Sequence, residues 1–255
     1  MNEPAVLVTR PAGQSEALCT GLRAQGLQPV VCPLIEIEAF PQPNVQQRQC
    51  LLALNEYQHL VFVSANAVRC GMRWIEDYWP QLPLDLSWYT VGDASARELA
   101  RHGVTAQRPE TEMNSEGLLA LADLQHVKDR KVLIIKGEGG REKIRETLQQ
   151  RGARVEELTS YRRHRPALAE GELYAIIEKH HCQLLLLSSG EALLNMVSLL
   201  NAEELLQVQQ LAVVAPGTRV AAIARTSGFS QVITAASATD DDMLAAITDY
   251  LATGG

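Results

Sequence analysis

The sequence has no long hydrophobic run, and this absence limits the class of protein. No stretch approaches the roughly 20 apolar residues of a transmembrane helix. The four leucines at 184–187 form a short segment that is typical of a buried strand. The first residues include Glu3 and Pro4 instead of a basic region followed by an apolar core. We therefore expect no signal peptide and a cytoplasmic protein.

Cysteine is also scarce and irregularly placed. The chain has five cysteines, an odd number, and no Cys-x-x-Cys spacing. This pattern supports neither a disulfide framework nor a zinc site, and buried thiols are the better interpretation. His180, His181 and Cys182 resemble a metal site in composition. Adjacent residues of a regular strand cannot point at one ion, so we expect a loop there.

Positive charge is in deficit. The chain has 23 Lys and Arg residues against 30 Asp and Glu, which gives a formal net charge of −7. No basic stripe interleaved with aromatic residues is present, so a general nucleic-acid surface is not expected. An anionic ligand would have to be bound by local cations and backbone amides. The 255 residues, 46% of them hydrophobic, are typical of a globular protein with two domains.

What the sequence does contain is an internal repeat, since residues 6–39 and 132–165 follow one plan. In both, a hydrophobic strand ends in a cation, a glycine-containing turn follows, and an amphipathic helix runs to a glycine before a second strand. Val6 and Val132 are 126 residues apart, as are Gly26 and Gly152. Such a period predicts a duplicated unit. Alternating strands and helices predict an α/β fold with two similar, doubly wound parallel-sheet lobes, each a flavodoxin-like half.

Small polar residues follow several predicted strands in both halves of the chain. In such sheets ligands bind at the carboxyl ends of strands, where helix N-termini offer amides to anions. Plain N-capping explains any one of these residues taken singly. It does not explain why both halves carry the same loops. The residues are Ser64, Asn66 and Ser95 in one half, and Ser188, Ser189, Gly190, Gly217 and Thr218 in the other.

Two cations, Arg10 and Lys136, stand where a buried strand is expected to open toward a cleft. Arg69, Arg141, Arg219 and the run 162–165 are further candidates, although the run could equally be a charged edge strand. The Gly137–Gly140 segment does not complete a GxGxxG motif, and no phosphate-binding loop or GxSxG elbow occurs. The residues thus predict a polar cleft for a carboxylate- or phosphate-rich ligand and leave the reaction open.

Six segments span almost the whole chain: VFVSANAV at 61–68, TVGDASARELARHG at 90–103, LIIKGEGGRE at 133–142, ELTSYRR at 157–163, LLLLSSGEAL at 184–193 and VAPGTRVAAIA at 214–224. Taken in this order, they resemble the uroporphyrinogen-III synthase family. One departure is Ala215-Pro216-Gly217, where a Gly-Pro-Thr-like turn is usual.

The resemblance implies a discontinuous first lobe, residues 1–34 plus 167–255, and a second lobe, residues 40–160. The linkers 34–40 and 158–166 would lie side by side as a two-stranded β-ladder, with a cleft between the lobes. It also implies a carbon–oxygen lyase that closes hydroxymethylbilane with inversion of ring D and loss of water, in tetrapyrrole (haem) biosynthesis. The family uses no metal or organic cofactor. A monomer is expected, and a transient contact with the preceding pathway enzyme is left open.

Tyr161 matches the functionally important tyrosine of the family and is the candidate acid, because a phenol can donate a proton to a leaving hydroxyl. The alternative is a tyrosine packed in an edge strand. A non-enzymatic bilobal protein that binds a polycarboxylate or phosphorylated ligand would show the same repeat, whereas the incomplete glycine-rich motifs disfavour a phosphosugar or nucleotide enzyme. The substrate-binding residues implied are Arg10, Ser64, Asn66, Ser95, Lys136, Ser188, Ser189, Gly217 and Thr218.

Overall fold

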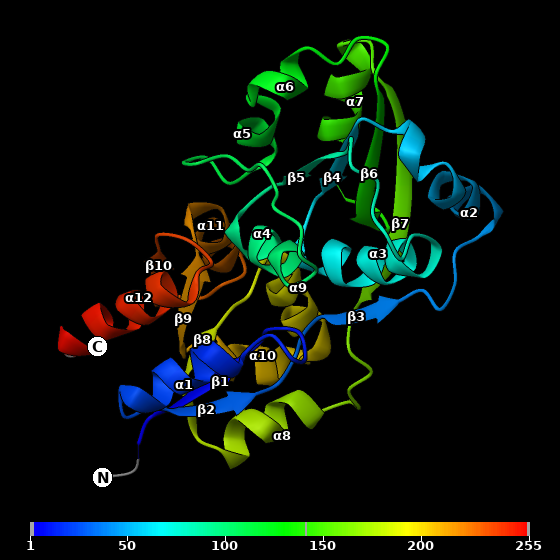
Figure 1. Cartoon of the computed structure of the whole chain (residues 1–255). Helices are drawn as coiled ribbons and strands as arrows, with labels where there is room; N and C mark the ends of the chain where they lie inside the picture. Colours follow the sequence, from blue (N-terminus) through cyan, green and yellow to red (C-terminus); the bar gives the residue numbers. More distant parts are fainter. Residues whose placement is uncertain (1–2, 141, 254–255) are drawn as a thin grey trace. The chain divides into compact units, whose positions relative to one another are not determined.

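The computed structural model describes residues 3–140 and 142–253. The chain forms two compact units (Figure 1): unit 1 comprises Met1–Glu36 and His164–Gly255, and unit 2 comprises Ile37–Arg163. The polypeptide therefore passes from one unit to the other twice. Each unit contains a sheet with parallel strands and helices, so the α/β fold predicted from the sequence is confirmed.

The sheet of unit 1 has five strands, all paired in parallel. Their order is β10-β9-β8-β1-β2. When the five strands are numbered along the chain and read from the β2 edge, this is the order 2-1-3-4-5 of the flavodoxin-like fold. The strands are β1 (Ala5–Val8), β2 (Gln28–Val31), β8 (Cys182–Leu186), β9 (Ala212–Pro216) and β10 (Val232–Ala235).

The core of unit 1 lies between this sheet and its helices. Leu18 and Leu22, one turn apart on α1, pack against Val6 and Val8 and against Met243 of α12. Gly21 allows α1 and α12 to approach, since a Cβ at this position would clash with the Leu244 side chain. The helices are α1 (Glu16–Ala24), α8 (Glu172–Lys179), α9 (Gly190–Leu199), α10 (Ala202–Val208), α11 (Thr218–Thr226) and α12 (Asp240–Ala252).

The sheet of unit 2 has the order β3-β7-β6-β4-β5. Strands β7, β6, β4 and β5 pair in parallel, and a parallel bridge from Tyr89 to Gln107 extends this set beyond β5. With β6 counted first and β7 second, the parallel strands repeat the 2-1-3-4 order of unit 1, and Gln107 takes the fifth place. The strands are β3 (Glu36–Ala39), β4 (His59–Phe62), β5 (Ser87–Thr90), β6 (Lys131–Gly137) and β7 (Arg154–His164).

Helices cover both faces of this sheet, because successive side chains of β4 are buried in two different core clusters. Val61 belongs to one core cluster, with Ile134 and Leu148, whereas Phe62 belongs to a second cluster with Met72 of α3. Burial on both faces explains why these parallel strands are continuously hydrophobic. The helical segments are α2 (Val45–Leu52), the 3₁₀ turn Leu54–Glu56, α3 (Ala65–Tyr78), α4 (Asp93–Ala100), α5 (Ser115–Leu119), α6 (Ala122–Gln125) and α7 (Lys143–Gln150).

Each of the two sequence repeats is divided between the two units. Its first copy begins with β1-α1-β2, which belongs to unit 1, whereas the matching β6-α7-β7 belongs to unit 2. Each unit thus combines the opening of one repeat with the remaining strands of the other. The chain crosses at β3 and at the end of β7, which are paired. There the Phe40 N–H donates to Ser160 O at 3.0 Å, and Arg162 forms a bidentate ion pair with Glu38 at 2.8 and 2.9 Å.

Among the described residues, no helix combines the length and the apolar character needed to span a bilayer. His180 and His181 lie in the turn before β8, as expected for a loop, whereas Cys182 is the first residue of that strand. Within residues 3–140 and 142–253, no three His, Cys, Asp or Glu side chains are arranged to hold a metal ion.

We predict that buried His59 makes the stability of unit 2 depend on pH. The side chain is 9% exposed, with Nδ1 3.2 Å from Tyr89 Oη. Burial, together with the Arg130 charge, lowers the pKa of His59 below 6.5. The unfolded chain therefore takes up a proton that the folded unit does not bind. The free energy of unfolding should fall as the pH drops below about 6.5, down to the folded pKa.

Urea unfolding measured by tryptophan fluorescence at pH 7.5 and 5.5 tests this prediction. The signal reports on unit 2, because all three tryptophans, Trp74, Trp79 and Trp88, lie in it. His59→Gln should reduce the loss of stability at the lower pH. The matched variant of the exposed His126, His126→Gln, should leave it unchanged. Equal pH dependence in all three proteins would contradict a role for His59.

Candidate functional site

The carboxyl ends of β4 and β6 in unit 2 border a cavity of 190 Å³. From these two neighbouring strands the chain continues in opposite directions across the sheet, to β5 on one side and to β7 on the other. This is the topological switch point at which doubly wound sheets bind ligands. The polar and charged residues that line the cavity include Ser64, Ser115, Lys136, Arg145, Glu157 and Tyr161.

Tyr161 reaches this cavity because β7 contains an irregularity. Lys136 pairs with Thr159 but Gly137 pairs with Tyr161, so Ser160 is an extra residue in β7. A bulge of this kind changes the direction in which the next side chain points. Consecutive residues Ser160 and Tyr161 are accordingly both buried, at 0% and 3% exposure. The tyrosine ring lies against the bare Cα of Gly137, where a Cβ would approach its Cζ to 2.6 Å.

Ser64 contacts the phenol of Tyr161. It follows β4 and caps α3, and its Oγ accepts a hydrogen bond from the Ala67 N–H at 3.0 Å. Ser64 is thus an N-cap, one of the two interpretations that the sequence offers for the polar residues after the strands. The same Oγ lies 2.9 Å from Tyr161 Oη. The end of β4, the first turn of α3 and the bulged part of β7 therefore meet through one pair of hydroxyl groups.

Lys136 is buried and already paired with carboxylates. Its Nζ lies 3.1 Å from Glu157 Oε1 and 3.4 Å from Glu142 Oε1, and the residue is 8% exposed. Arg145 Nε also pairs with Glu142, at 2.7 Å. A second cavity of 590 Å³ adjoins this cluster and is lined by Lys136, Glu138 and Glu157. The ammonium group thus lies at both cavities, with its charge balanced by carboxylates of the protein.

Two of the residues predicted in this half of the chain stand apart from the smaller cavity. Asn66 is the second residue of α3, and its Oδ1 accepts a hydrogen bond from Arg69 Nη1 at 3.2 Å. Ser95 lies inside the first turn of α4, which begins at Asp93, and is 5% exposed. The structure therefore brings Ser64, Lys136 and Tyr161 together, and places Asn66 and Ser95 elsewhere on unit 2. Arg141 lies outside the described residues.

In unit 1, the loops after β1 and β8 are joined by hydrogen bonds. The Ser188 N–H donates to Thr9 Oγ1 at 3.0 Å, and Ser188 Oγ donates to Thr9 O at 3.4 Å. Ser189 caps α9 by accepting from the Ala192 N–H at 3.1 Å. Thr9 was missed by the sequence analysis, although it is the last β-branched residue before Arg10. It fixes the polar edge of the sheet at the switch point of unit 1.

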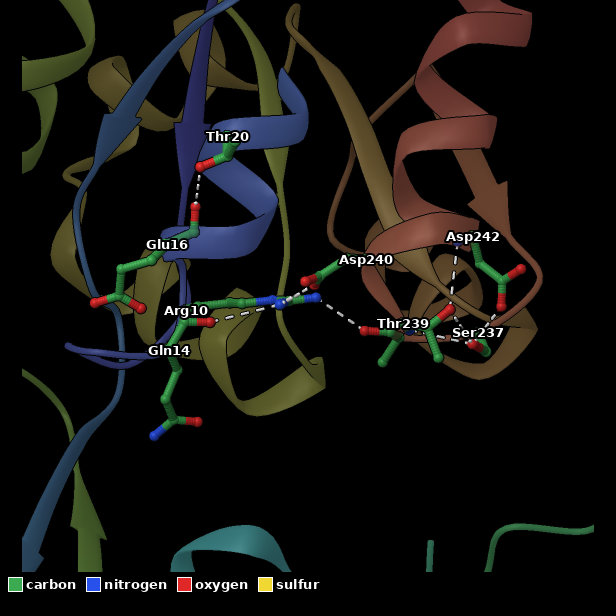
Figure 2. A network of polar contacts seen from close by, with 9 residues as sticks. Arg10, Gln14, Glu16, Thr20, Ser237, Thr239, Asp240 and Asp242 are labelled. Atoms are coloured by element: carbon green, nitrogen blue, oxygen red, sulfur yellow. Dashed lines mark hydrogen bonds and ion pairs between the residues drawn. The ribbon is translucent and has the colours of Figure 1, made fainter. Parts of the chain in front are cut away.

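Arg10 is held by the first turn of α12 (Figure 2). Its guanidinium forms an ion pair with Asp240 and donates to Ala238 O at 2.9 Å. Hydrogen bonds from Ser237 and from Thr239, the N-cap of the helix, lower the pKa of the neighbouring Asp242. Acidic residues are favoured at a helix N-terminus. Arg10 thus connects the turn after β1 to α12, with its charge compensated by Asp240.

Gly217 and Thr218 stand at the start of α11. Gly217 has φ +86°, a conformation that favours glycine. Its N–H donates to Ala235 O at 3.1 Å, which joins the ends of β9 and β10. Thr218 is the first residue of the helix and is exposed. The Ala215-Pro216-Gly217 turn is the point where the sequence departs from the usual family turn. Its Gly217 amide therefore forms a hydrogen bond inside unit 1.

These features define a class of protein: a duplicated, doubly wound α/β protein with polar loops at the carboxyl ends of its strands. A sequence model described as uroporphyrinogen-III synthase HemD matches residues 16–245. The uroporphyrinogen-III synthase of Escherichia coli (strain K12) is 32% identical over 254 residues, which cover 95% of this chain and 99% of that protein. The Proteus mirabilis protein of the same name is 34% identical over 165 residues, 62% of this chain and 80% of that one. The chain belongs to the uroporphyrinogen-III synthase family.

Solved structures agree with this assignment at the level of the fold. A mutant uroporphyrinogen III synthase from the extremely thermophilic bacterium Thermus thermophilus is similar with a TM-score of 0.61 and 17% identity, covering 98% of this chain and 99% of that one. The synthetase from Helicobacter pylori 26695 gives a TM-score of 0.62 at 13% identity, covering 97% and 99%. The resemblance stated from the sequence is therefore confirmed for both family and fold.

We predict that Lys136→Gln lowers the stability of unit 2 by about 1–3 kcal/mol, because it leaves Glu142 and Glu157 without their shared ammonium group. The matched variant is Lys143→Gln. Lys143 pairs with Glu116 at 2.6 Å, but both side chains are more than 40% exposed. That variant should cost less than about 1 kcal/mol. Urea unfolding followed by tryptophan fluorescence measures both, and equal losses would contradict a structural role for Lys136.

Proposed function

We propose that this protein is a uroporphyrinogen-III synthase that closes hydroxymethylbilane to the ring-D-inverted macrocycle with loss of water. The observation that carries the proposal is the family match over residues 16–245. The alternative, a non-enzymatic binding protein, is not favoured by the relatives from Proteus mirabilis, Escherichia coli and Salmonella typhimurium, each of which is named uroporphyrinogen-III synthase.

The proposed reaction requires control of conformation more than strong chemical activation. The hydroxyl group of the linear tetrapyrrole must leave to form an azafulvene, and the substituted carbon of ring D must then attack it. The spiro intermediate that results fragments and closes again. Because the free substrate closes spontaneously to the other isomer, the protein must hold the chain curled so that attack by ring D is faster, which is a proximity effect.

We assign the assistance of hydroxyl departure to Tyr161. Its position in the lining of the 190 Å³ cavity and the contact of its Oη with Ser64 support this assignment. A hydrogen bond donated in a buried site is stronger than one in water. The phenol would donate to the departing oxygen as the carbon–oxygen bond lengthens.

We assign substrate binding to polar groups at the carboxyl edges of both sheets. The amides of helix N-termini and the hydroxyl groups would donate hydrogen bonds to the acetate and propionate carboxylates, because such positions favour anions. Arg10 and Lys136 would contact the substrate while keeping their ion pairs with Asp240 and Glu157. The proposed set is Arg10, Asn66, Ser95, Lys136, Ser188, Ser189, Gly217 and Thr218, whereas Ser64 lies at the same edge in contact with Tyr161.

The proposal includes the finer properties that the family resemblance implies. We infer a carbon–oxygen lyase that works in the cytoplasm as a monomer, without a metal or an organic cofactor. We also infer lobes made of residues 1–34 plus 167–255 and of residues 40–160, joined by the segments 34–40 and 158–166. The pairing of β3 with β7 supports the ladder between these two segments.

Product analysis tests the reaction. Freshly generated hydroxymethylbilane is added to the protein, the product is oxidised, and the uroporphyrin isomers are separated by chromatography. The expected result is mainly isomer III, formed faster than in a control with heat-denatured protein. Isomer I alone, at the spontaneous rate, would contradict the proposed function and favour the binding-protein alternative.

Tyr161→Phe tests the proposed acid. Because the phenol proton is lost while the ring and its packing on Gly137 remain, we expect kcat for isomer III to fall by about a hundredfold. The midpoint of urea unfolding should change little, since the lost hydroxyl makes one described hydrogen bond. Unchanged turnover in a correctly folded variant would remove Tyr161 from the mechanism.

A further inference from the structure

We propose that Ser64 is a positioning residue that donates its hydroxyl proton to Tyr161 Oη and so leaves the phenol proton available to the substrate. The inference rests on the proposed function and deepens it, because it assigns to Ser64 an action through Tyr161 instead of direct binding of substrate. It follows from three features: the hydrogen bonds of Ser64, the packing of the Tyr161 ring, and the different residue at the matching position of unit 1.

The first feature is the number of hydrogen bonds that the Ser64 hydroxyl can donate and accept. The group has one proton and two lone pairs. One lone pair accepts the Ala67 N–H at 3.0 Å, and Tyr161 Oη lies 2.9 Å away. Accepting the backbone N–H polarises the hydroxyl and makes its own O–H a better donor. Donation from Ser64 to Tyr161 therefore satisfies both groups and leaves the Tyr161 proton free for donation.

The opposite arrangement would disable the phenol. If Tyr161 donated to Ser64, its single proton would be held inside the protein and could not assist a leaving hydroxyl. The distance alone is compatible with either donor. The cap on α3 favours Ser64 as the donor, because accepting the Ala67 N–H makes the serine O–H a better donor and leaves its oxygen only one further lone pair.

The second feature is that the ring of Tyr161 has little freedom to move. It is 3% exposed and lies against Gly137, where a Cβ would come within 2.6 Å of Cζ and 2.7 Å of Cε2. The bulge at Ser160 fixes the backbone, and the Glu138 N–H donates to Tyr161 O at 2.8 Å. Rotation of the hydroxyl about the Cζ–Oη bond is then the main remaining freedom. Ser64 is placed to fix that rotation.

The third feature is a comparison inside the molecule. In unit 1, Ser189 caps α9 just as Ser64 caps α3. The residue that stands 126 positions before Tyr161 is Ile35, which has no hydroxyl. A serine cap after the third strand is thus common to both units, whereas the contact with a phenol belongs to unit 2. Helix capping accounts for the serine but not for its pairing with Tyr161.

The test compares steady-state isomer III formation by variants at position 64. Ser64→Ala should lower kcat by about tenfold, the factor that the loss of one orienting hydrogen bond represents, with KM changed less than about twofold. Ser64→Thr keeps both the cap and the donor and should retain kcat within about threefold. A residue that only binds substrate would instead raise KM.

A double-mutant cycle with Tyr161→Phe gives a readout that capping cannot produce. Once the phenol is absent, Ser64→Ala should lower kcat by less than about twofold, because its effect passes through Tyr161. Independent, multiplicative losses would overturn the proposal, as would full kcat in Ser64→Ala. Failure of the unmodified protein to form isomer III would instead contradict the proposed function itself.

Two controls separate positioning from loss of a helix cap. Asn201→Ala removes the N-cap of α10 in unit 1, where Asn201 accepts from the N–H groups of Glu203 and Glu204. It should lose a similar amount of stability and keep kcat. If Ser64→Ala is too unstable to assay, Ser64→Gly loses the donor at little cost in capping and should show the same tenfold loss, about 1.4 kcal/mol. Wild-type kcat in Ser64→Gly would overturn the proposal.

Discussion

The parallel pairing of strands from different repeats is the constraint on which the rest of this structure depends. β1 pairs with β8 in unit 1 and β4 pairs with β6 in unit 2. Each pair joins the opening of one repeat to the continuation of the other. Each is also the switch point of its sheet, so the polar loops at Ser188 and Ser64 lie beside those after Thr9 and Lys136. The exchange of repeats therefore makes each unit discontinuous in sequence and, in the same step, places its candidate ligand groups together.

Unit 2 differs from unit 1 at this edge because of one extra residue in β7. The bulge at Ser160 turns Tyr161 toward the cavity, and Gly137 provides the space for its ring. A regular strand would place alternate residues on opposite faces of the sheet. The two units thus share a strand order while one of them acquires a phenol at the end of β4. Function in this fold depends on such local changes of the loops and strand ends.

The cations at these edges are mostly engaged within the protein. Lys136 pairs with Glu142 and Glu157, Arg10 with Asp240, and Arg162 with Glu38. In a chain with a net charge of −7, such pairs hold positive charge at defined positions. A polycarboxylate would then meet helix N-termini and hydroxyl groups as well as cations, which favours recognition by geometry over attraction by a strong positive field.

The sequence by itself determined the duplication and the α/β class, because hydrophobic periodicity and the period of 126 are properties of the chain that do not depend on how the strands are arranged. It indicated the family through the resemblance of six ordered segments. It also singled out Ser64 and Tyr161 as candidate site residues. Only the tertiary structure decided which of the predicted residues meet. Pairing between segments far apart in the chain brings Ser64 to Tyr161, as no local pattern could reveal. The carboxylates that balance Lys136, the role of Thr9 and the bulge at Ser160 likewise arise from contacts between distant segments and from strand register, which a single sequence leaves open.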